Sequence, residues 1–466
     1  MCKNGAARID VISNRRGRSA PRAKRRAWAC MATAAVLASA RVGWGQEVTS
    51  YWSGVTGSWT DGTQWSTDPN YPNNGTPSGT TYDAVINAPG TALYGVTLNS
   101  NLTVDSVTVD SPNAQLAQTG ETLTTASLNV AAGEYVLRDG VLEDTTLTFG
   151  PTATAQILEG TVLDSALSMP TTATVTGNLI GVTLSSDITD ADTLAVKDLN
   201  AAGHTINFGP SSLAITQFDV VPDSNGSGTL SNVNLNMTMV GQRVPGGGGY
   251  VFSYGSDLAL GQTVTAEGWG AIGTDHGEPL SADPILFSQG TITANTSGMT
   301  LTIAPTNFVN SGTVQATNGG VLSIMPGGTT TWTNNGILAV DSISTINVNQ
   351  NITFANGSAF DAVLGSGGVS GIITIAGNLK FQSNVSLNLS MLPGAVFSGP
   401  YEIASYTGTL TGSFAEVTTG FTVSYSQPGE ILVTADTLLT SPLPEPGRGL
   451  IYSGAYLLLA KRRRRA

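Results

Sequence analysis

The chain has 466 residues, of which 56 are glycine, 11% are charged and 7% are aromatic. This composition argues against a coiled coil and against an enzyme rich in titratable groups, and it favours repetitive β structure. Residues 46–440 hold four basic and 30 acidic side chains, a net charge of −26. A surface so acidic repels phosphate backbones, so nucleic acid is not an expected partner.

Residues 1–45 are predicted to be a secretory signal peptide. A basic lead from Lys3 to Arg26 precedes the apolar run Ala27–Ala40. That run suits the apolar core of a signal peptide, but a membrane span needs roughly 20 residues. Both cysteines, Cys2 and Cys30, lie in this segment. We therefore expect the exported chain to lack disulfides and to depend on packing for its stability.

Residues 46–90 are predicted to form an N-terminal cap rich in tryptophan. Trp52 and Trp59 belong to a W-x-G-x-x-G-x-W pattern, Trp65 follows, and Asp83–Ile86 reads as a strand. Open ends of β structure invite aggregation, so a cover is expected at each end of a repetitive body. The pattern resembles the beginning of autotransporter-type passengers, which implies a β-solenoid after it.

Residues 91–395 are predicted to be that repetitive body. Two series of segments align on glycines: Gly140, Gly160 and Gly181, spaced 20 and 21, and Gly290, Gly312 and Gly336, spaced 22 and 24. The second series is followed by the alternating apolar segments Met299–Ile303, Val321–Ile324 and Ser344–Val348. Alternation indicates strands, and the period indicates a solenoid.

A single rung of this repeat buries too little apolar surface to offset the entropy of ordering it, so it cannot fold alone. Stacking pairs each strand above and below and joins inward side chains into continuous ladders. The predicted fold is therefore all-β, a right-handed parallel β-helix. Residues 396–440 are predicted to close its other end as an antiparallel hairpin cap, because Gly399–Asp436 reads as short strands joined by turns.

Residues 441–466 combine a Pro-rich break, a short apolar segment and a basic stop. The break contains Pro444, Glu445 and Pro446, the apolar segment is Gly449–Ala460, and the stop contains Lys461, Arg462, Arg463, Arg464 and Arg465. This order resembles a PEP-CTERM sorting domain. The resemblance implies recognition by an exosortase-type enzyme at the envelope of a Gram-negative-type bacterium that makes exopolysaccharide. The apolar segment is shorter than the roughly 20 residues of a span, so full, transient and defective anchoring all stay open.

Two groups of residues are candidates for chemistry. Asp187, Asp190 and Asp192 have a spacing that could hold calcium through carboxylate oxygens, and the alternative is that they form a polar corner of a rung. Asp275, His276 and Glu278 follow Trp269, an aromatic residue that could stack on a sugar, and the alternative is a solvated acidic loop that leaves the coil. HExxH, P-loop and dinucleotide-binding motifs are absent from the sequence.

These features together predict a non-catalytic, exported surface or matrix protein with a structural or adhesive role. Its expected partners are exopolysaccharide or a neighbouring cell surface, and no cofactor is required beyond the calcium considered above. The alternative is a polysaccharide-active β-helix hydrolase that uses paired carboxylates, because fold alone does not exclude an enzyme.

Overall fold

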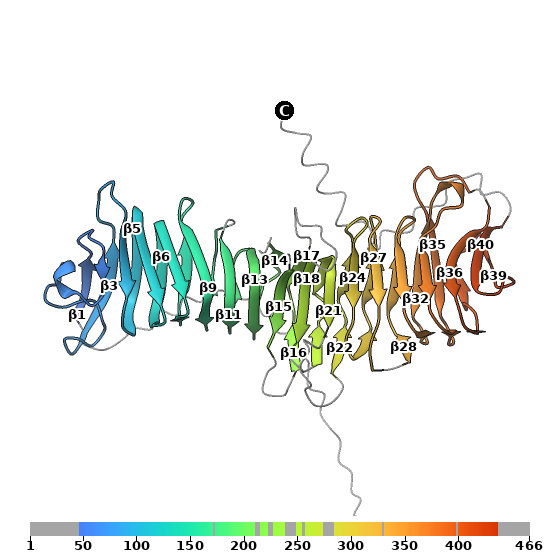
Figure 1. The fold of residues 1–466 in the computed structure, drawn as a ribbon, viewed down its shortest axis with the longest axis horizontal. Helices are drawn as coiled ribbons and strands as arrows, with labels where there is room; N and C mark the ends of the chain where they lie inside the picture. Colours follow the sequence, from blue (N-terminus) through green and yellow to red (C-terminus); the bar gives the residue numbers. More distant parts are fainter. Residues whose placement is uncertain are drawn as a thin grey trace, which may run out of the picture. The chain divides into compact units, whose positions relative to one another are not determined.

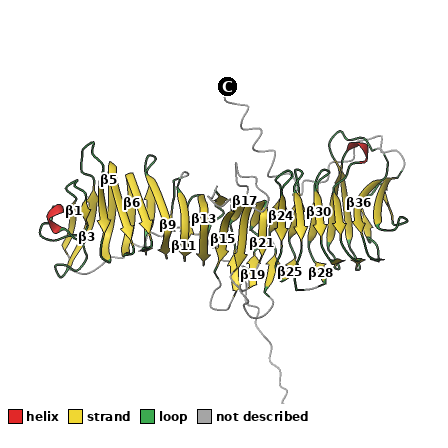
Figure 2. Cartoon of the chain, viewed as in Figure 1, coloured by secondary structure: helices red, strands yellow, loops and turns green. Residues whose placement is uncertain are grey.

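The computed structural model describes residues 46–436, except 171–172, 210–214, 222–226, 238–247, 254–256, 274–283, 329 and 398. The predicted signal peptide and sorting tail therefore lie outside the described residues. From β1 (Gln46–Tyr51) to β40 (Glu430–Ala435), the described chain is built from β-strands stacked side by side (Figures 1 and 2). Two short 3-10 helices, Gly62–Gln64 and Ser366–Gly368, interrupt them.

Three parallel ladders, here called faces A, B and C, run through the stack. Face A includes β20 (Thr265–Gly268), β23 (Thr291–Ala294), β26 (Thr313–Ala316) and β29 (Ile337–Val340). Face B includes β21 (Gly270–Gly273), β24 (Thr300–Ile303), β27 (Val321–Ile324) and β30 (Thr345–Val348). Face C includes β22 (Ile285–Ser288), β25 (Asn307–Asn310), β28 (Thr331–Asn334) and β31 (Asn351–Phe354). The chain visits A, B and C in turn, which is the winding of a parallel β-helix.

The alternating segments of the second glycine series are confirmed as β24, β27 and β30, with bounds within one residue of those predicted. Leu301, Leu322 and Ile346 are fully buried on these strands, and the residues between the inward positions are more exposed. Stacked inward residues form one continuous apolar core, as period-2 alternation requires.

The glycines of the second series stack on one another at a corner of the helix. A Cβ atom on Gly312 would lie 2.1 Å from the carbonyl oxygen of Gly290, and one on Gly336 would lie 2.2 Å from that of Gly312. Any larger residue would collide with the backbone of the preceding rung. Close approach of rungs is thus the physical reason for this repeat.

The alignment of the first series is wrong at its third member. Gly160 is in register with Gly177, not Gly181, and Leu163 is in register with Ile180. Gly181 instead continues the column of turn residues Asp144 and Asp164, and all three have positive φ, at 64°, 56° and 47°. Aspartate and glycine both tolerate this left-handed conformation, so the sequence pattern did not separate a turn glycine from a packing glycine.

In the N-terminal half, single strands pass around the corners of the helix. β5 (Leu102–Thr119) and β6 (Thr122–Arg138) pair in parallel along most of their length, with register shifts next to Asp110. The tryptophan-rich segment adds rungs here: β1 pairs with β3 (Thr80–Ile86), and β2 (Gly57–Ser58) pairs with β4 (Tyr94–Leu98), both in parallel.

The three tryptophans cluster beside these first rungs. Trp52, Trp59 and Trp65 are 3%, 0% and 2% exposed, and the ring of Trp65 meets the other two edge to face at 5.0 and 4.7 Å. The indole N–H of Trp65 donates to the carbonyl oxygen of Trp59 at 2.7 Å, and that of Trp59 donates to Pro72 at 2.8 Å. Every indole thus has the partner that a buried tryptophan needs.

At the other end, antiparallel pairing closes the stack. β36 (Tyr401–Tyr406), β37 (Leu410–Thr411) and β38 (Glu416–Val417) still pair in parallel with the preceding rung. β39 (Phe421–Ser424) and β40 then form an antiparallel hairpin, and β40 also runs antiparallel to β36. The predicted antiparallel cap is confirmed, but it begins at β39 and not at Gly399.

Candidate functional site

The three predicted calcium ligands lie at the start of β13 (Ile188–Lys197) and do not converge. Asp190 is fully buried, whereas Asp187 and Asp192 are exposed. Among the described residues, no group of three or more His, Cys, Asp or Glu side chains is arranged to hold a metal ion. The structure therefore does not assemble these aspartates into a calcium site.

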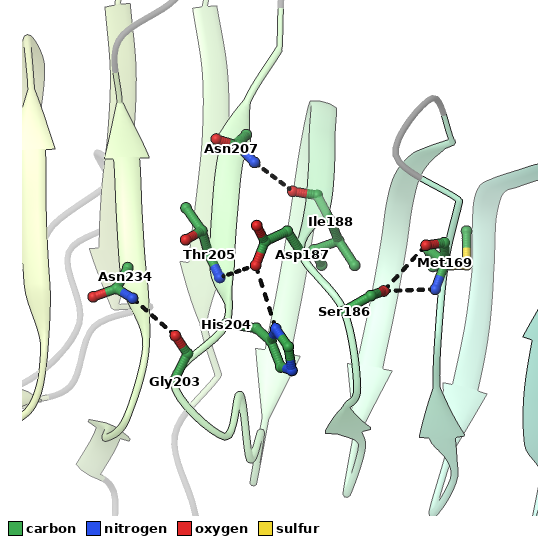
Figure 3. Close-up of polar contacts among 9 residues, drawn as sticks. All are labelled: Met169, Ser186, Asp187, Ile188, Gly203, His204, Thr205, Asn207 and Asn234. Atoms are coloured by element: carbon green, nitrogen blue, oxygen red, sulfur yellow. Dashed lines mark hydrogen bonds and ion pairs between the residues drawn. The ribbon is translucent and has the colours of Figure 1, made fainter. Parts of the chain in front are cut away.

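Asp187 instead links two rungs (Figure 3). Its Oδ1 atom accepts a hydrogen bond from the backbone N–H of Thr205 at 2.8 Å and lies 3.3 Å from Nδ1 of His204. The side chains of His204 and Asp187 are 35% and 55% exposed, so this pair contributes little to stability. The adjacent Ser186 hydroxyl bonds to the backbone of Met169 on the preceding rung. Ser186 is thus engaged away from His204, and the three side chains do not form the hydrogen-bonded relay of a nucleophilic triad.

Asp190 is a buried carboxyl group at a corner where the register of the rungs shifts. Its Oδ1 atom accepts from the backbone N–H of Asp192 at 3.1 Å, and Oδ2 has no hydrogen-bond partner. Burial raises the pKa of Asp190 well above its usual value, and the charges of Asp192 and Asp219 add to this effect. The geometry therefore favours a protonated, structural carboxyl group.

Trp269 cannot take part in the second predicted site. Trp269 is 2% exposed, so its ring belongs to the core and cannot stack on a sugar. The residues that would carry the chemistry, Asp275, His276 and Glu278, lie outside the described residues.

A pair of carboxylates does occur on the first rungs. A hydrogen bond to Asp83 and the charge of Asp83 raise the pKa of Glu47, with smaller effects of burial and of the charge of Asp105. The hydroxyl of Ser106 donates to Asp83, and the side-chain amide of Asn74 donates to Asp105 at 2.9 Å. Glu47 is exposed on β1, and an open surface of this kind does not exclude water from a reacting bond.

A small cavity lies elsewhere, lined by residues that include Val196, Val220 and Leu230. Its volume is about 40 Å³, enough for one or a few water molecules. It is too small for a sugar ring.

Outward amide groups bond to polar side chains of the neighbouring rung at several places on the described surface. They bond from rung to rung, in the pairs Asn236 with Asn207 (3.0 Å), Gln315 with Thr293 (2.9 Å), Asn388 with Asp361 (2.7 Å), and Gln115 and Gln156 with Glu134 (2.7 Å each). Sequence reasoning missed them because the partners are 19 to 29 residues apart.

The three parallel ladders define a parallel β-helix protein, a class set by its fold and not by one activity. Comparison with known proteins finds no matching family model, no similar curated protein and no similar solved structure. Within the described segments, no helix has the length and apolar character needed to cross a membrane. Function is accordingly inferred from the surface of this fold and from the sequence.

Proposed function

We propose that this chain is an exported, non-catalytic surface or matrix protein whose faces make repeated weak contacts with polysaccharide. Outward amide and hydroxyl groups that bond from rung to rung carry this proposal, as in the bonds from Asn236 to Asn207 and from Thr148 to Asn129. Sugar hydroxyls both donate and accept hydrogen bonds, so they can pair with side chains of this kind. Each contact is weak, and many contacts on one chain multiply into useful avidity.

Export and retention are proposed from the two ends of the sequence. The basic lead and apolar run of residues 1–45 support secretion, and the Pro444–Pro446 motif with its basic stop supports handling by an exosortase-type enzyme. The net charge of −26 between residues 46 and 440 would keep neighbouring copies apart and soluble at the cell surface.

Fractionation of cells tests the location. The full chain is expected in the envelope fraction, and a chain lacking residues 441–466 is expected in the medium. A Pro444→Ala, Pro446→Ala variant keeps the apolar segment and basic stop, and we expect it to be handled like the deletion. If the full chain and the deletion reach the same compartment, retention through the tail is wrong.

A reducing-sugar assay on a panel of polysaccharides tests the absence of catalysis. We expect no turnover by the full chain. Turnover that disappears in Glu47→Gln or Asp83→Asn would overturn the proposal and favour a carboxylate-dependent hydrolase.

A further inference from the structure

Asn-Gly sequences recur along the chain, and one of them lies in an exposed turn. Asn356 and Gly357 are the central residues of the turn Ala355–Ser358, which joins β31 on face C to β32 (Ala359–Leu364) on face A. The N–H of the last turn residue donates to the carbonyl oxygen of the first at 3.1 Å. Gly357 has a φ of 80°, a conformation that glycine adopts without strain.

An asparagine that precedes a glycine can lose its side-chain amide without an enzyme. The backbone nitrogen of the glycine attacks the Cγ atom of the asparagine, a C–N bond forms, and the side-chain nitrogen leaves as ammonia with the proton from the glycine N–H. Water then opens the five-membered imide at either carbonyl group, which gives aspartate or isoaspartate. Glycine has no side chain to hinder the attack, so this pair is especially labile. The reaction requires a carboxamide that is free to turn and a glycine backbone that is accessible.

Both requirements are met at Asn356, which is exposed together with Gly357. The backbone N–H of Asn356 donates to Oε1 of Gln382 at 3.2 Å, whereas its carboxamide has no hydrogen-bond partner among the described residues. A Cβ atom on Gly357 would have nothing within 4 Å. The Gly357 N–H donates to the carbonyl oxygen of Asn384 on the next rung at 3.2 Å, and this bond must open for the attack. Residues 330–397, which include the turn and the rungs on both sides, are described without a gap.

A second Asn-Gly sequence at the same corner has the opposite environment. Asn335 and Gly336 join β28 to β29, one rung earlier. Gly336 is buried, and a Cβ atom on it would lie 2.2 Å from the carbonyl oxygen of Gly312. The backbone of Gly336 is therefore packed against the preceding rung and has no room to move toward the side chain of Asn335. The same two residues are thus shielded on one rung and open on the next.

Hydrogen bonds hold the carboxamide at two further Asn-Gly sequences. The carboxamide of Asn74 donates to Asp105 at 2.9 Å and accepts from the backbone N–H of Tyr82 at 2.8 Å. The carboxamide of Asn318 donates to the carbonyl oxygen of Asn295 at 3.1 Å. These bonds must break before either carboxamide can turn toward the glycine that follows it, which slows the reaction.

We infer that Asn356 is a site of spontaneous deamidation in the folded chain. The conversion needs no reactant other than water, so it accumulates with the age of each molecule. It adds a carboxylate to an acidic body, and the isoaspartate product also inserts a methylene group into the backbone of the turn. The longer backbone cannot keep both the turn bond between Ser358 and Ala355 and the rung bond from Gly357 to Asn384, so stacking weakens at this corner.

Incubation of the purified full chain at pH 8 and 37 °C tests this inference. Chymotryptic digestion and mass spectrometry follow the conversion of each asparagine, and a zero-time sample corrects for conversion during digestion. We expect Asn356 to convert at least about tenfold faster than Asn335 and Asn74, because the reaction at those two residues requires local opening of the structure. Incubation in guanidinium chloride, at a concentration where circular dichroism shows the chain to be unfolded, is the control. Unfolding removes the packing and the hydrogen bonds, so the three sites should then convert at similar rates.

Asn356→Gln is the matched variant. Its longer side chain would have to close a six-membered imide, which forms far more slowly, and the backbone bond to Gln382 is kept. The unaltered chain should develop a more acidic form on anion exchange, and this early form should be missing from Asn356→Gln. Thermal melting of the variant before incubation should match that of the unaltered chain.

Conversion of Asn356 no faster than that of Asn335 in the folded chain would overturn the inference. Persistence of the difference in the unfolded chain would assign it to the sequence and not to the fold, and would overturn it as well. Because these measurements use purified protein without polysaccharide, their outcome is independent of the proposed function.

Discussion

The side-chain amide of Asn310 donates a hydrogen bond of 2.8 Å to the amide oxygen of Asn334 on the next rung, and both side chains are fully buried. Asn334 also donates to the carbonyl oxygen of Gly336 at 3.0 Å, and Asn310 accepts from the N–H of Gly312 at 3.1 Å. The two amides thus satisfy the backbone of the corner glycines. A satisfied buried network of this kind favours one register of the rungs over others.

Replacement of Asn334 by alanine should destabilise the helix. The change removes partners from Asn310 and Gly336, and unpaired buried polar groups cost about 1–3 kcal/mol. Urea denaturation followed by circular dichroism measures the loss. Asn388→Ala is the control, since Asn388 makes a similar bond to Asp361 at 2.7 Å at an exposed position, and a loss below about 0.5 kcal/mol is expected. Equal losses would contradict the role assigned to burial.

Replacement of Gly312 by alanine should destabilise the fold, although alanine adds only one methyl group. The new methyl group would lie 2.1 Å from the carbonyl oxygen of Gly290, so the rungs must separate, at a cost of about 2 kcal/mol or more. Gly327→Ala adds the same methyl group with nothing within 4 Å, and its melting temperature should stay close to that of the unaltered chain. Similar melting of both variants would argue against stacked glycines as the reason for the repeat.

Stability should fall as pH rises, in part because of Asp190. Burial holds its folded-state pKa above the unfolded value, so the folded chain binds the proton more tightly. The stabilisation is complete below the unfolded pKa and is lost as pH rises toward the folded pKa. Burial raises the pKa of Glu267 and Asp361 in the same direction. Melting temperatures at pH 5 and pH 8 should differ less in Asp190→Asn than in the unaltered chain, and an unchanged difference would exclude Asp190 as a contributor.

Replacement of Trp59 by alanine should destabilise the first rungs selectively. Trp59 is fully buried and contacts Trp65 at 4.7 Å, and truncation of such a side chain costs about 3–5 kcal/mol. Stacked repeats interact chiefly with their neighbours, so hydrogen exchange should accelerate in β1 and β3 but not in β30. Tyr51→Ala, at a side chain that is 48% exposed, is the control and should leave exchange in β3 unchanged. Uniform acceleration throughout the chain would show that the stack unfolds as one unit.

Local alternation and the spacing of repeated residues were enough to predict the strands of the later rungs. The strands that became β24, β27 and β30 are short, regular and inward-facing at every second residue. Gly177 and Gly181 show where this reasoning fails. Both have positive φ, but Gly177 packs against the backbone of Gly160, whereas Gly181 lies in the column of turn residues Asp144 and Asp164. Both roles select glycine, and only the pairing of rungs tells them apart.

Functional residues depend on contacts between rungs, and sequence spacing does not report these. Asp187 and Asp190 are close in sequence, yet the first is exposed at a corner and the second is buried in the core. Trp269 has the side chain of a sugar-stacking residue but lies inside the helix. Gln315 and Thr293 are 22 residues apart in sequence, and their hydrogen bond exists only because the rungs stack.

By itself, the sequence determined that this chain is all-β, repetitive and acidic, because alternation, glycine spacing and charge are properties of the chain read in order. Only the tertiary structure decided which side chains meet across rungs, such as Asn310 with Asn334 and Gln315 with Thr293. The physical reason is that each rung is one turn of the β-helix, and the number of residues in a turn varies along the chain. A change of a few residues in one turn, as between Gly160 and Gly177, shifts every neighbour without changing the alternation that makes the strands.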